Sequence, residues 1–276
     1  MVQITAAEVN KLRQQTGAGM MDCKKALVES EGDFDKAIDI LRKKGQKLAS
    51  SRAGRDANEG VVIGKVSDDG TKAYALVLNC ETDFVAKNQE MVDFAWSILN
   101  LAAEKNCADL DALKACDMNG RTVEENVTDM IGKTGEKLDL SVYEVVEGAA
   151  AFAYIHPGNR ITSIAAFNKV VEGVEQAGKN VVMQIAAMAP VAIDKDDVSQ
   201  EIIEKEIEIG KDQARQEGKA EELLEKIALG KLNKFFKENT LINQDSIIDN
   251  KKTVGQTLKA LDKDLTVTAF KRLALS

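Results

Sequence analysis

The sequence is poor in the residues that most often carry catalytic or metal chemistry. Among its 276 residues are one histidine, one tryptophan, two prolines and four cysteines. The cysteines, Cys23, Cys80, Cys107 and Cys116, form no Cys-x-x-Cys pair, so the spacing of a structural zinc site is missing. A single imidazole, His156, with no cluster of cysteines or carboxylates around it in the sequence also makes a poor metal site. We therefore expect no metal, no cofactor and no catalytic residue.

Long hydrophobic runs and an excess of basic residues are absent as well. No apolar stretch approaches the ~20 residues of a membrane span, and residues 1–5 lack the basic start and apolar run of a signal peptide. With 37 Lys and Arg against 45 Asp and Glu, the net charge of −8 argues against nonspecific binding of nucleic acid. We expect a cytoplasmic globular protein with reduced thiols that contacts neither membrane nor nucleic acid.

Residues 1–45 have the pattern of three short helices. Thr5 and Glu8 form a capping box at the start of the first helix, which Gly17-Ala18-Gly19 ends. Asp22 is a good N-cap for the second helix. The third helix has one apolar face, formed by Phe34, Ala37, Ile38 and Leu41. The layout resembles the ubiquitin-associated fold.

Residues 46–55 are interpreted as a linker. Gly45 and Ser50-Ser51 favour a flexible connection, and the cations of this region suit the end of the preceding helix. The same cations, with no acid among them, would also fit a basic docking segment.

The body of the chain has the pattern of antiparallel strands with covering helices. Residues 56–140 form its first part, in which strands 61–66 and 74–78 flank the hairpin turn Asp68-Asp69-Gly70. Residues 141–190 and 239–276 form its second part. Helices are predicted at 91–103, 109–116, 123–133, 181–189 and 253–261, and strands at 142–146, 152–155, 161–167 and 267–273.

Residues 191–238 are predicted to form an inserted antiparallel helical hairpin. Apolar residues recur at helical spacing among many charges, and Gly218 separates the two helices. Because two helices alone bury little, the apolar stripe is expected to need a partner, either the chain's own core or a second copy. The fold class is therefore α+β, with an N-terminal helical module, an antiparallel-sheet-plus-helix core and this hairpin.

Residues 173–180 come close to a phosphate-binding loop. Gly173, Gly178 and Lys179 have its spacing, but Asn180 stands where a hydroxyl should bind magnesium. Glu175 would also place a carboxylate in an anion site. We interpret the segment as a loop before a helix.

Two exposed-looking apolar features remain. Phe84 follows Asp83 on the connection between a strand and a helix that starts near Gln89, where an aromatic is either buried under its own loop or offered to a partner. Met20-Met21 follows a glycine-rich break, and we expect one of the two side chains to point inward and one outward.

Two long motifs resemble the signatures of the elongation factor Ts family, the guanine-nucleotide exchange factors of bacterial translation. They are Thr16-Gly-Ala-Gly-Met-Met-Asp-Cys-Lys-Lys-Ala-Leu27 and Asn79-Cys-Glu-Thr-Asp-Phe-Val-Ala-Lys-Asn88. Tyr154-Ile-His-Pro-Gly-Asn-Arg-Ile161 is similar to the strand and turn that carry the family's contact histidine. The run from Ile161 to Asn168 departs from the family's usual sequence, and Pro157 and Asn159 change the turn.

This resemblance implies that the chain binds elongation factor Tu, both GDP-bound and nucleotide-free, and promotes GDP release. It implies docking by Leu12, Met20, Met21 and Lys24, and contacts of the core by Ile131, Gly132 and His156. It places Thr82, Asp83, Phe84 and Val85 at the region that dislocates the magnesium ion of the partner's nucleotide site. It also implies that residues 191–238 can join two copies of the chain.

Two rival functions stay open at this stage. The first is a ubiquitin-associated-type adapter, which binds its partners through residues 1–45 and has no exchange activity. The second is a cysteine-dependent enzyme that uses Cys23 or Cys80.

Overall fold

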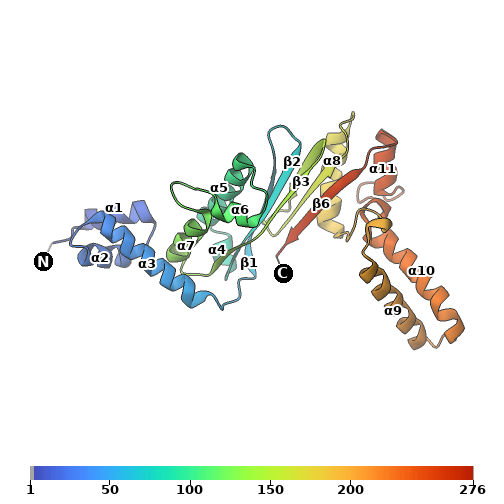
Figure 1. Ribbon diagram of the computed structural model, residues 1–276, viewed down its shortest axis with the longest axis horizontal. Coiled ribbons are helices and arrows are strands. Elements are labelled where there is room, and N and C mark those ends of the chain that lie inside the picture. Colours follow the sequence, from blue (N-terminus) through green and yellow to red (C-terminus); the bar gives the residue numbers. More distant parts are fainter. Residues whose placement is uncertain (1–2, 276) are drawn as a thin grey trace. The chain divides into compact units, whose positions relative to one another are not determined.

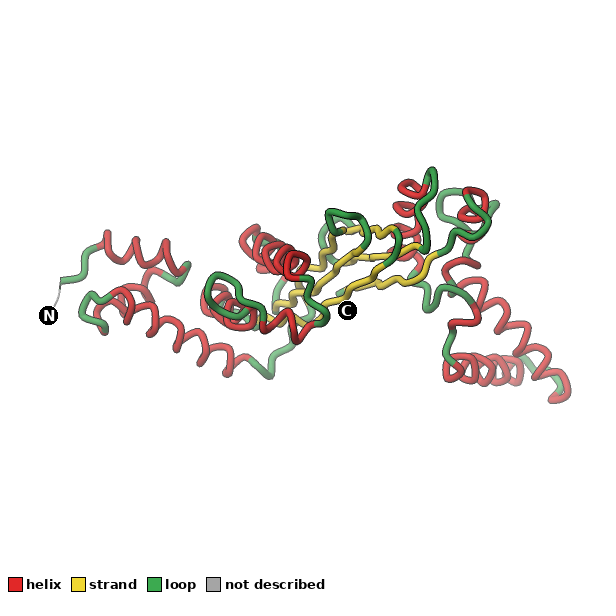
Figure 2. The backbone as a smooth tube through the Cα atoms, turned by 45° about the horizontal axis from the view of Figure 1, so that its top comes forward, coloured by secondary structure: helices red, strands yellow, loops and turns green. Residues whose placement is uncertain are grey.

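The computed structural model describes residues 3–275, which form helices and two small antiparallel sheets (Figures 1 and 2). The α+β class is confirmed. The chain divides into two compact units: Met1–Ile63, Leu76–Glu144 and Ala274–Ser276 in the first, and Gly64–Ala75 with Val145–Leu273 in the second. The finer domain boundaries given by the sequence stay a prediction.

Three helices open the first unit: α1 (Ala6–Thr16), α2 (Met20–Glu29) and α3 (Phe34–Arg52). The Thr5–Glu8 capping box is present, and Gly17 ends α1 with a φ of 67°. Their shared core consists of Val9, Leu12, Cys23, Ala26, Leu27 and Ala37. Three helices are therefore confirmed, while their likeness to the ubiquitin-associated fold stays a prediction.

The start of α2 differs from the prediction. Gly19 is its N-cap, and Asp22 lies inside the first turn without capping the helix. The Asp22 carboxylate instead forms an ion pair with Lys44 of α3. An acid in the first turn still favours the helix, because the N-terminal end of the helix dipole is positive.

The predicted linker over 46–55 is wrong for most of its length, because α3 continues to Arg52. Gly45 does not break this helix. It is buried against α7 (Val123–Thr134), where a Cβ added at Gly132 would lie 3.3 Å from the Gly45 Cα atom. The true connection begins at Ala53 and is held by Lys137, whose Nζ donates hydrogen bonds to the carbonyls of Ala53 (3.0 Å) and Arg55 (2.9 Å).

The first sheet has the order β1-β2-β3, formed by β1 (Glu59–Val66), β2 (Lys72–Cys80) and β3 (Leu138–Glu147). The predicted turn lies between the first two strands, with Gly70 at a φ of 72°. Four helices follow β2 in the chain before β3: α4 (Asp83–Ala86), α5 (Gln89–Lys105), α6 (Leu110–Ala115) and α7. Each longer element starts or ends within a few residues of its predicted position, and α4 was not predicted.

The second unit contains the sheet β4-β5-β6, formed by β4 (Ala150–Ile155), β5 (Ile161–Phe167) and β6 (Val267–Ala274). Strands β4 and β5 are antiparallel, with Ala150 opposite Phe167. Helix α8 (Val174–Met188) packs against both. The core of this unit includes Phe167, Val182 and Ile185, together with Leu258 of α11 (Val254–Leu261).

Helix α8 corrects the interpretation of residues 173–180 as a loop. The helix begins at Val174, so this segment forms its first two turns. Gly178 is buried, and a Cβ at this position would overlap the ring of Phe152. The glycine allows helix and strand to approach closely, which explains its presence without a phosphate ligand.

The helical hairpin is confirmed as α9 (Gln200–Gln216) and α10 (Glu221–Asn239), flanked by the short helices η1 (Lys195–Asp197) and η2 (Leu241–Asn243). Figure 1 shows α9 and α10 side by side. A Cβ added at Gly210 would lie 3.1 Å from the Ala228 Cα atom, and Ala214, Leu224 and Leu232 are buried. The two helices therefore bury part of their stripe against each other, while Ile202, Ile227 and Phe235 are only half-buried. Ile209, Leu223 and Leu229 remain exposed, and pairing with a second copy stays a prediction.

Candidate protein-docking site

Phe84 is the most exposed large hydrophobic side chain in residues 3–275, with 83% of its surface accessible. It lies on α4, a helix of four residues, and not on an irregular connection as predicted. Asn88 caps the next helix, α5, which begins at Gln89 as expected. An aromatic ring that the fold leaves in water in this way is available to another protein.

A carboxylate from a distant part of the chain fixes the start of α4. Thr82 is the N-cap of this helix. Its backbone N–H donates to Glu136 Oε2 (3.0 Å), and its hydroxyl donates to Glu136 Oε1 (2.6 Å). One carboxylate therefore accepts two hydrogen bonds from the residue that precedes α4, which holds the backbone of the turn under Phe84.

Glu81 holds the same turn from the other side. Its carboxylate accepts hydrogen bonds from the Lys137 N–H (2.6 Å), from Arg52 (2.7 Å) and from Arg55 (3.1 Å). These three donors, with the Lys137 N–H contributing most, lower the pKa of Glu81 to about 2. The end of α3, the start of β3 and the turn before Phe84 thus meet at one carboxylate.

This pairing predicts a dependence of stability on pH. Because the pKa of Glu81 is lower in the folded protein than its ordinary value near 4.5, its ionised form stabilises the fold above that value. The stabilisation is lost as the pH falls toward 2. We expect Glu81→Gln to lower the melting temperature at pH 7, and the gap from wild type to close between about pH 4.5 and 2. A gap that stays constant over this range, measured by circular dichroism, would contradict the assignment.

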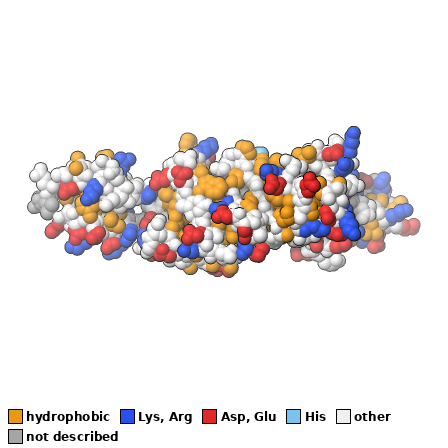
Figure 3. All heavy atoms as spheres, turned by 90° about the horizontal axis from the view of Figure 1, so that it is seen from above, with side chains coloured by type: hydrophobic (Ala, Val, Ile, Leu, Met, Phe, Trp, Pro, Cys, Tyr) orange, Lys and Arg blue, Asp and Glu red, His pale blue; other side chains and the backbone are white. Residues whose placement is uncertain are grey.

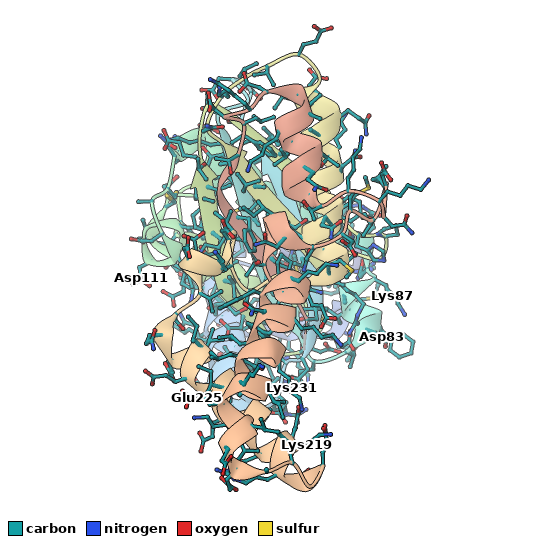
Figure 4. All side chains as sticks on the ribbon, turned by 90° about the vertical axis from the view of Figure 1, so that its right-hand side faces the viewer. Asp83, Lys87, Asp111, Lys219, Glu225 and Lys231 are labelled. Carbon is teal, nitrogen blue, oxygen red and sulfur yellow. The ribbon has the colours of Figure 1, made fainter. Side chains whose placement is uncertain are left out.

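The acidic neighbour of Phe84 is paired within α4 itself. The Asp83 carboxylate accepts a hydrogen bond from Lys87 Nζ (2.6 Å), which lowers the pKa of Asp83 (Figure 4). Both side chains are exposed, so a partner can compete for either charge at small cost. Val85 is half-buried next to Phe84 and donates its N–H to the Thr82 hydroxyl.

The N-terminal helices present a second apolar surface on α2. Met20 and Met21 are 56% and 64% exposed, so the prediction of one buried and one exposed methionine is wrong. Lys24 is exposed between them and Val28, which is 56% exposed. Val28 was missed by the sequence analysis, although it follows Met21 by seven residues and so lies on the same helix face. We call Met20, Met21, Lys24 and Val28 the α2 patch.

Leu12 does not belong to the α2 patch. Its side chain is fully buried in the core of the three helices, so the prediction that it contacts a partner is wrong. The burial follows from its place on the inner face of α1, one turn after Val9. Leu12 can support the patch only from below.

Ile131 and Gly132 of α7 face the chain's own helices. The Ile131 side chain is buried, and Gly132 packs against Gly45 of α3. The structure therefore does not present the Ile131 side chain to solvent, contrary to the prediction of a partner-facing contact. Lys133, the next residue, is exposed and forms an ion pair with Glu90 (3.3 Å).

His156 lies in the second unit, on the turn between β4 and β5, and is exposed. Its backbone N–H donates to the carbonyl of Ile161 (2.9 Å), and Gly158 and Asn159 have φ values of 94° and 55°. Tyr154 Oη and His156 Nδ1 are 3.1 Å apart, which orients the imidazole. The residues that alter the family's usual turn thus form a closed turn with the histidine at its edge.

Cys23 and Cys80 lack the setting of a catalytic nucleophile. Cys23 and Cys80 are fully buried. Burial, with a further contribution from the charge of Glu136, raises the pKa of the Cys80 thiol to about 12, the opposite of the change that activates a thiol. Within residues 3–275 no three His, Cys, Asp or Glu side chains group as a metal site would require. No helix in the same range is long and apolar enough to cross a membrane.

Comparison with known proteins connects these features. A family model described as elongation factor TS matches residues 81–276, a range that includes Glu81 and Phe84. The chain belongs to the elongation factor Ts family. It is 52% identical to elongation factor Ts of Christiangramia forsetii over 275 residues, with all of both chains covered. Identity to the elongation factor Ts of Flavobacterium psychrophilum and of Amoebophilus asiaticus is 50%, covering 100% and 98% of each chain.

Members of the elongation factor Ts family are exchange factors for elongation factor Tu in translation elongation. This role agrees with the exposed apolar side chains of Phe84 and of the α2 patch. Figure 3 shows acidic and basic side chains interspersed with apolar ones over the visible face, and no continuous basic field of the kind that binds nucleic acid.

Proposed function

We propose that this chain binds elongation factor Tu carrying GDP and expels the nucleotide by inserting Phe84 at the edge of the nucleotide site. The observation that carries the proposal is an almost fully exposed aromatic ring on a turn held by Glu81 and Glu136. A ring that enters a partner must keep its position against resistance, and two carboxylates with five hydrogen bonds supply that support. The ring disturbs the magnesium ion and the water around the phosphates.

The energies require a broad contact as well as a wedge. A nucleotide held at nanomolar affinity is bound by about 12 kcal/mol, whereas burying one phenyl ring yields about 1.5–3 kcal/mol. Phe84 therefore depends on docking elsewhere, for which the α2 patch is the best candidate in the first unit. His156 supplies a contact from the second unit.

No covalent chemistry is part of this function. The accelerated step is dissociation, so what matters is that the chain binds nucleotide-free elongation factor Tu better than the loaded form. By thermodynamic linkage, GDP or GTP then lowers the affinity of elongation factor Tu for this chain by the same factor by which this chain lowers its affinity for the nucleotide. The cycle ends when GTP binds and the chain leaves.

Stopped-flow release of a fluorescent GDP from elongation factor Tu tests the proposal directly. We expect catalytic amounts of this chain, with excess unlabelled nucleotide, to speed release, and the rate to saturate as its concentration rises. Loss of the acceleration when the partner is held in a magnesium-free buffer would support an action through the ion. No acceleration with magnesium present would refute the exchange function.

The docking role of the α2 patch makes a separate prediction. The double change Met20→Ser and Met21→Ser should raise the concentration needed for half-maximal release by about 10-fold or more, with the saturated rate nearly unchanged. The double change removes binding energy that is the same in the initial complex and in the transition state for release. This energy is roughly 1.5–3 kcal/mol for each methionine that the partner fully buries. A matched control is Ile247→Ser and Ile248→Ser, two adjacent exposed apolar residues outside the proposed contacts. Equal effects of both pairs would contradict the assignment.

The nucleotide-release experiments also distinguish the exchange factor from the ubiquitin-associated-type adapter. An adapter predicts that residues 1–45 alone bind the partner as well as the full chain and that nucleotide release is unaffected. The structure weakens this alternative, because α3 continues to Arg52 and packs on α7, so residues 1–45 end inside a helix. The cysteine-dependent enzyme is disfavoured by the burial of Cys23 and Cys80.

A further inference from the structure

Two cysteines that the proposed function does not use lie in contact. The Sγ atoms of Cys107 and Cys116 are 3.0 Å apart, nine positions from each other in the sequence. Both are free thiols in this structure. The other two cysteines have different neighbours: the Cys23 Sγ donates to the carbonyl of Ala18 (3.6 Å) and the Cys80 Sγ to that of Thr82 (3.1 Å).

The backbone holds both thiols in place. Cys107 follows the end of α5, and its N–H donates to the carbonyl of Ala102 (3.0 Å), while its own carbonyl accepts a hydrogen bond from Tyr143 Oη (3.0 Å). Cys116 follows α6, with its N–H bonded to the carbonyl of Leu113 (3.1 Å) and its carbonyl to the N–H of Val123 (3.0 Å). The two sulfurs therefore need to move by only about 1 Å to reach the length of a disulfide bond.

The two thiols differ in access. Cys107 is buried, whereas Cys116 is partly exposed. Burial, with a further contribution from the hydrogen bond to Cys116, raises the pKa of the Cys107 thiol to about 12. A small oxidant can thus reach Cys116 first, with Cys107 behind it as the second thiol.

We propose that Cys107 and Cys116 form an oxidation site, at which a low-molecular-weight disulfide such as oxidised glutathione converts the dithiol to an intramolecular disulfide. The Cys116 thiolate attacks one sulfur of oxidised glutathione, forms a mixed disulfide and releases one glutathione thiolate. Cys107 then loses its proton, and its sulfur attacks Cys116 Sγ and displaces the second glutathione thiolate. Two protein thiols are oxidised, and one glutathione disulfide is reduced to two thiols.

The new bond would close a loop around α6 (Leu110–Ala115). A cross-link stabilises a protein chiefly by restricting its unfolded chain, provided that it fits the folded geometry. Since the sulfurs already touch, we expect the oxidised protein to melt about 5–10 °C higher than the reduced protein. The site then acts as a redox-dependent staple of the first unit.

Peptide mapping tests the proposal on the full-length protein. The native protein is incubated with oxidised glutathione, blocked with iodoacetamide during unfolding and digested with trypsin without reduction. Trypsin cuts after Lys105, Lys114 and Arg121, so Cys107 and Cys116 fall in separate peptides, 106–114 and 115–121. We expect these peptides to be joined, with Cys23 and Cys80 alkylated as internal controls.

Two results would overturn the proposal. One is a stable glutathione adduct on Cys116 with Cys107 still reduced, and the other is oxidation of Cys23 or Cys80 to the same extent. Cys116→Ser, a change at a partly exposed position, should abolish both the joined peptides and the rise in melting temperature. Cys116→Ala serves as a second variant. If oxidised glutathione still raises the melting temperature of both variants, the proposed stabilisation by this disulfide is refuted.

Discussion

Phe84→Ala is expected to slow the release of GDP from elongation factor Tu by about 10- to 150-fold at limiting concentrations of this chain. The ring is 83% exposed in the free protein, so removing it costs the fold little. Its burial in a partner yields about 1.5–3 kcal/mol, and each 1.36 kcal/mol in the barrier to release changes the rate tenfold. The melting temperature of the variant should match that of wild type.

Comparison of several variants separates the wedge from general apolar contact. Phe84→Leu keeps part of the apolar volume and should fall between wild type and Phe84→Ala. Val170→Ala is the matched control, because this residue is 68% exposed but lies outside the proposed contacts. Stopped-flow traces at several concentrations distinguish a lowered maximal rate from weakened binding. A maximal rate that Phe84→Ala leaves unchanged would assign the ring to docking and not to expulsion of the nucleotide.

The turn under Phe84 also shows how far the sequence could predict the site. The residues alone left Phe84 either buried or offered to a partner, and the resemblance to the family signature favoured the exposed ring; the start of α5 was placed correctly. The hydrogen bonds from Thr82 to Glu136 were not inferred, since the two residues are 54 positions apart and do not together form a recognisable sequence motif. A contact of this range depends on how β3 meets the end of β2, which periodicity and capping do not specify.

The sequence analysis made other errors where contacts between distant elements determine the structure. The end of α3 was misplaced because Gly45 was interpreted as part of a flexible connection, and the start of α8 was misplaced because residues 173–180 were interpreted as a loop. Gly45 and Gly178 are each buried where another element approaches closely, so tertiary packing overrides the low helix propensity of glycine. Leu12 and Ile131 were assigned to contacts by matching positions in the family's motifs, and such matching does not tell whether a side chain is buried; both are. The Thr5 capping box is present where the sequence predicts it, and Thr122 and Thr253 form two further capping boxes that the sequence analysis did not name.

Gly178→Ala is expected to destabilise the second unit. The new Cβ would overlap the ring of Phe152, which cannot swing away freely because its edge packs on Phe167 with 5.4 Å between ring centroids. Overpacking of this kind costs about 1–3 kcal/mol. The loss should exceed the gain of up to about 1 kcal/mol that alanine brings to a helix interior. Urea unfolding followed by circular dichroism measures the net change.

Gly230→Ala in α10 is the matched control for that substitution. It is also a helical glycine, but a Cβ there has no atom within 4 Å, so alanine should stabilise the protein by about 0.5–1 kcal/mol. The same Gly→Ala change is thus expected to lower the free energy of unfolding at position 178 and to raise it at position 230. Adding Phe152→Leu to Gly178→Ala should recover part of the loss, since the coupled pair shares one contact. If Gly178→Ala instead stabilises the chain as Gly230→Ala does, the close approach of α8 to β4 cannot be what requires glycine at this position.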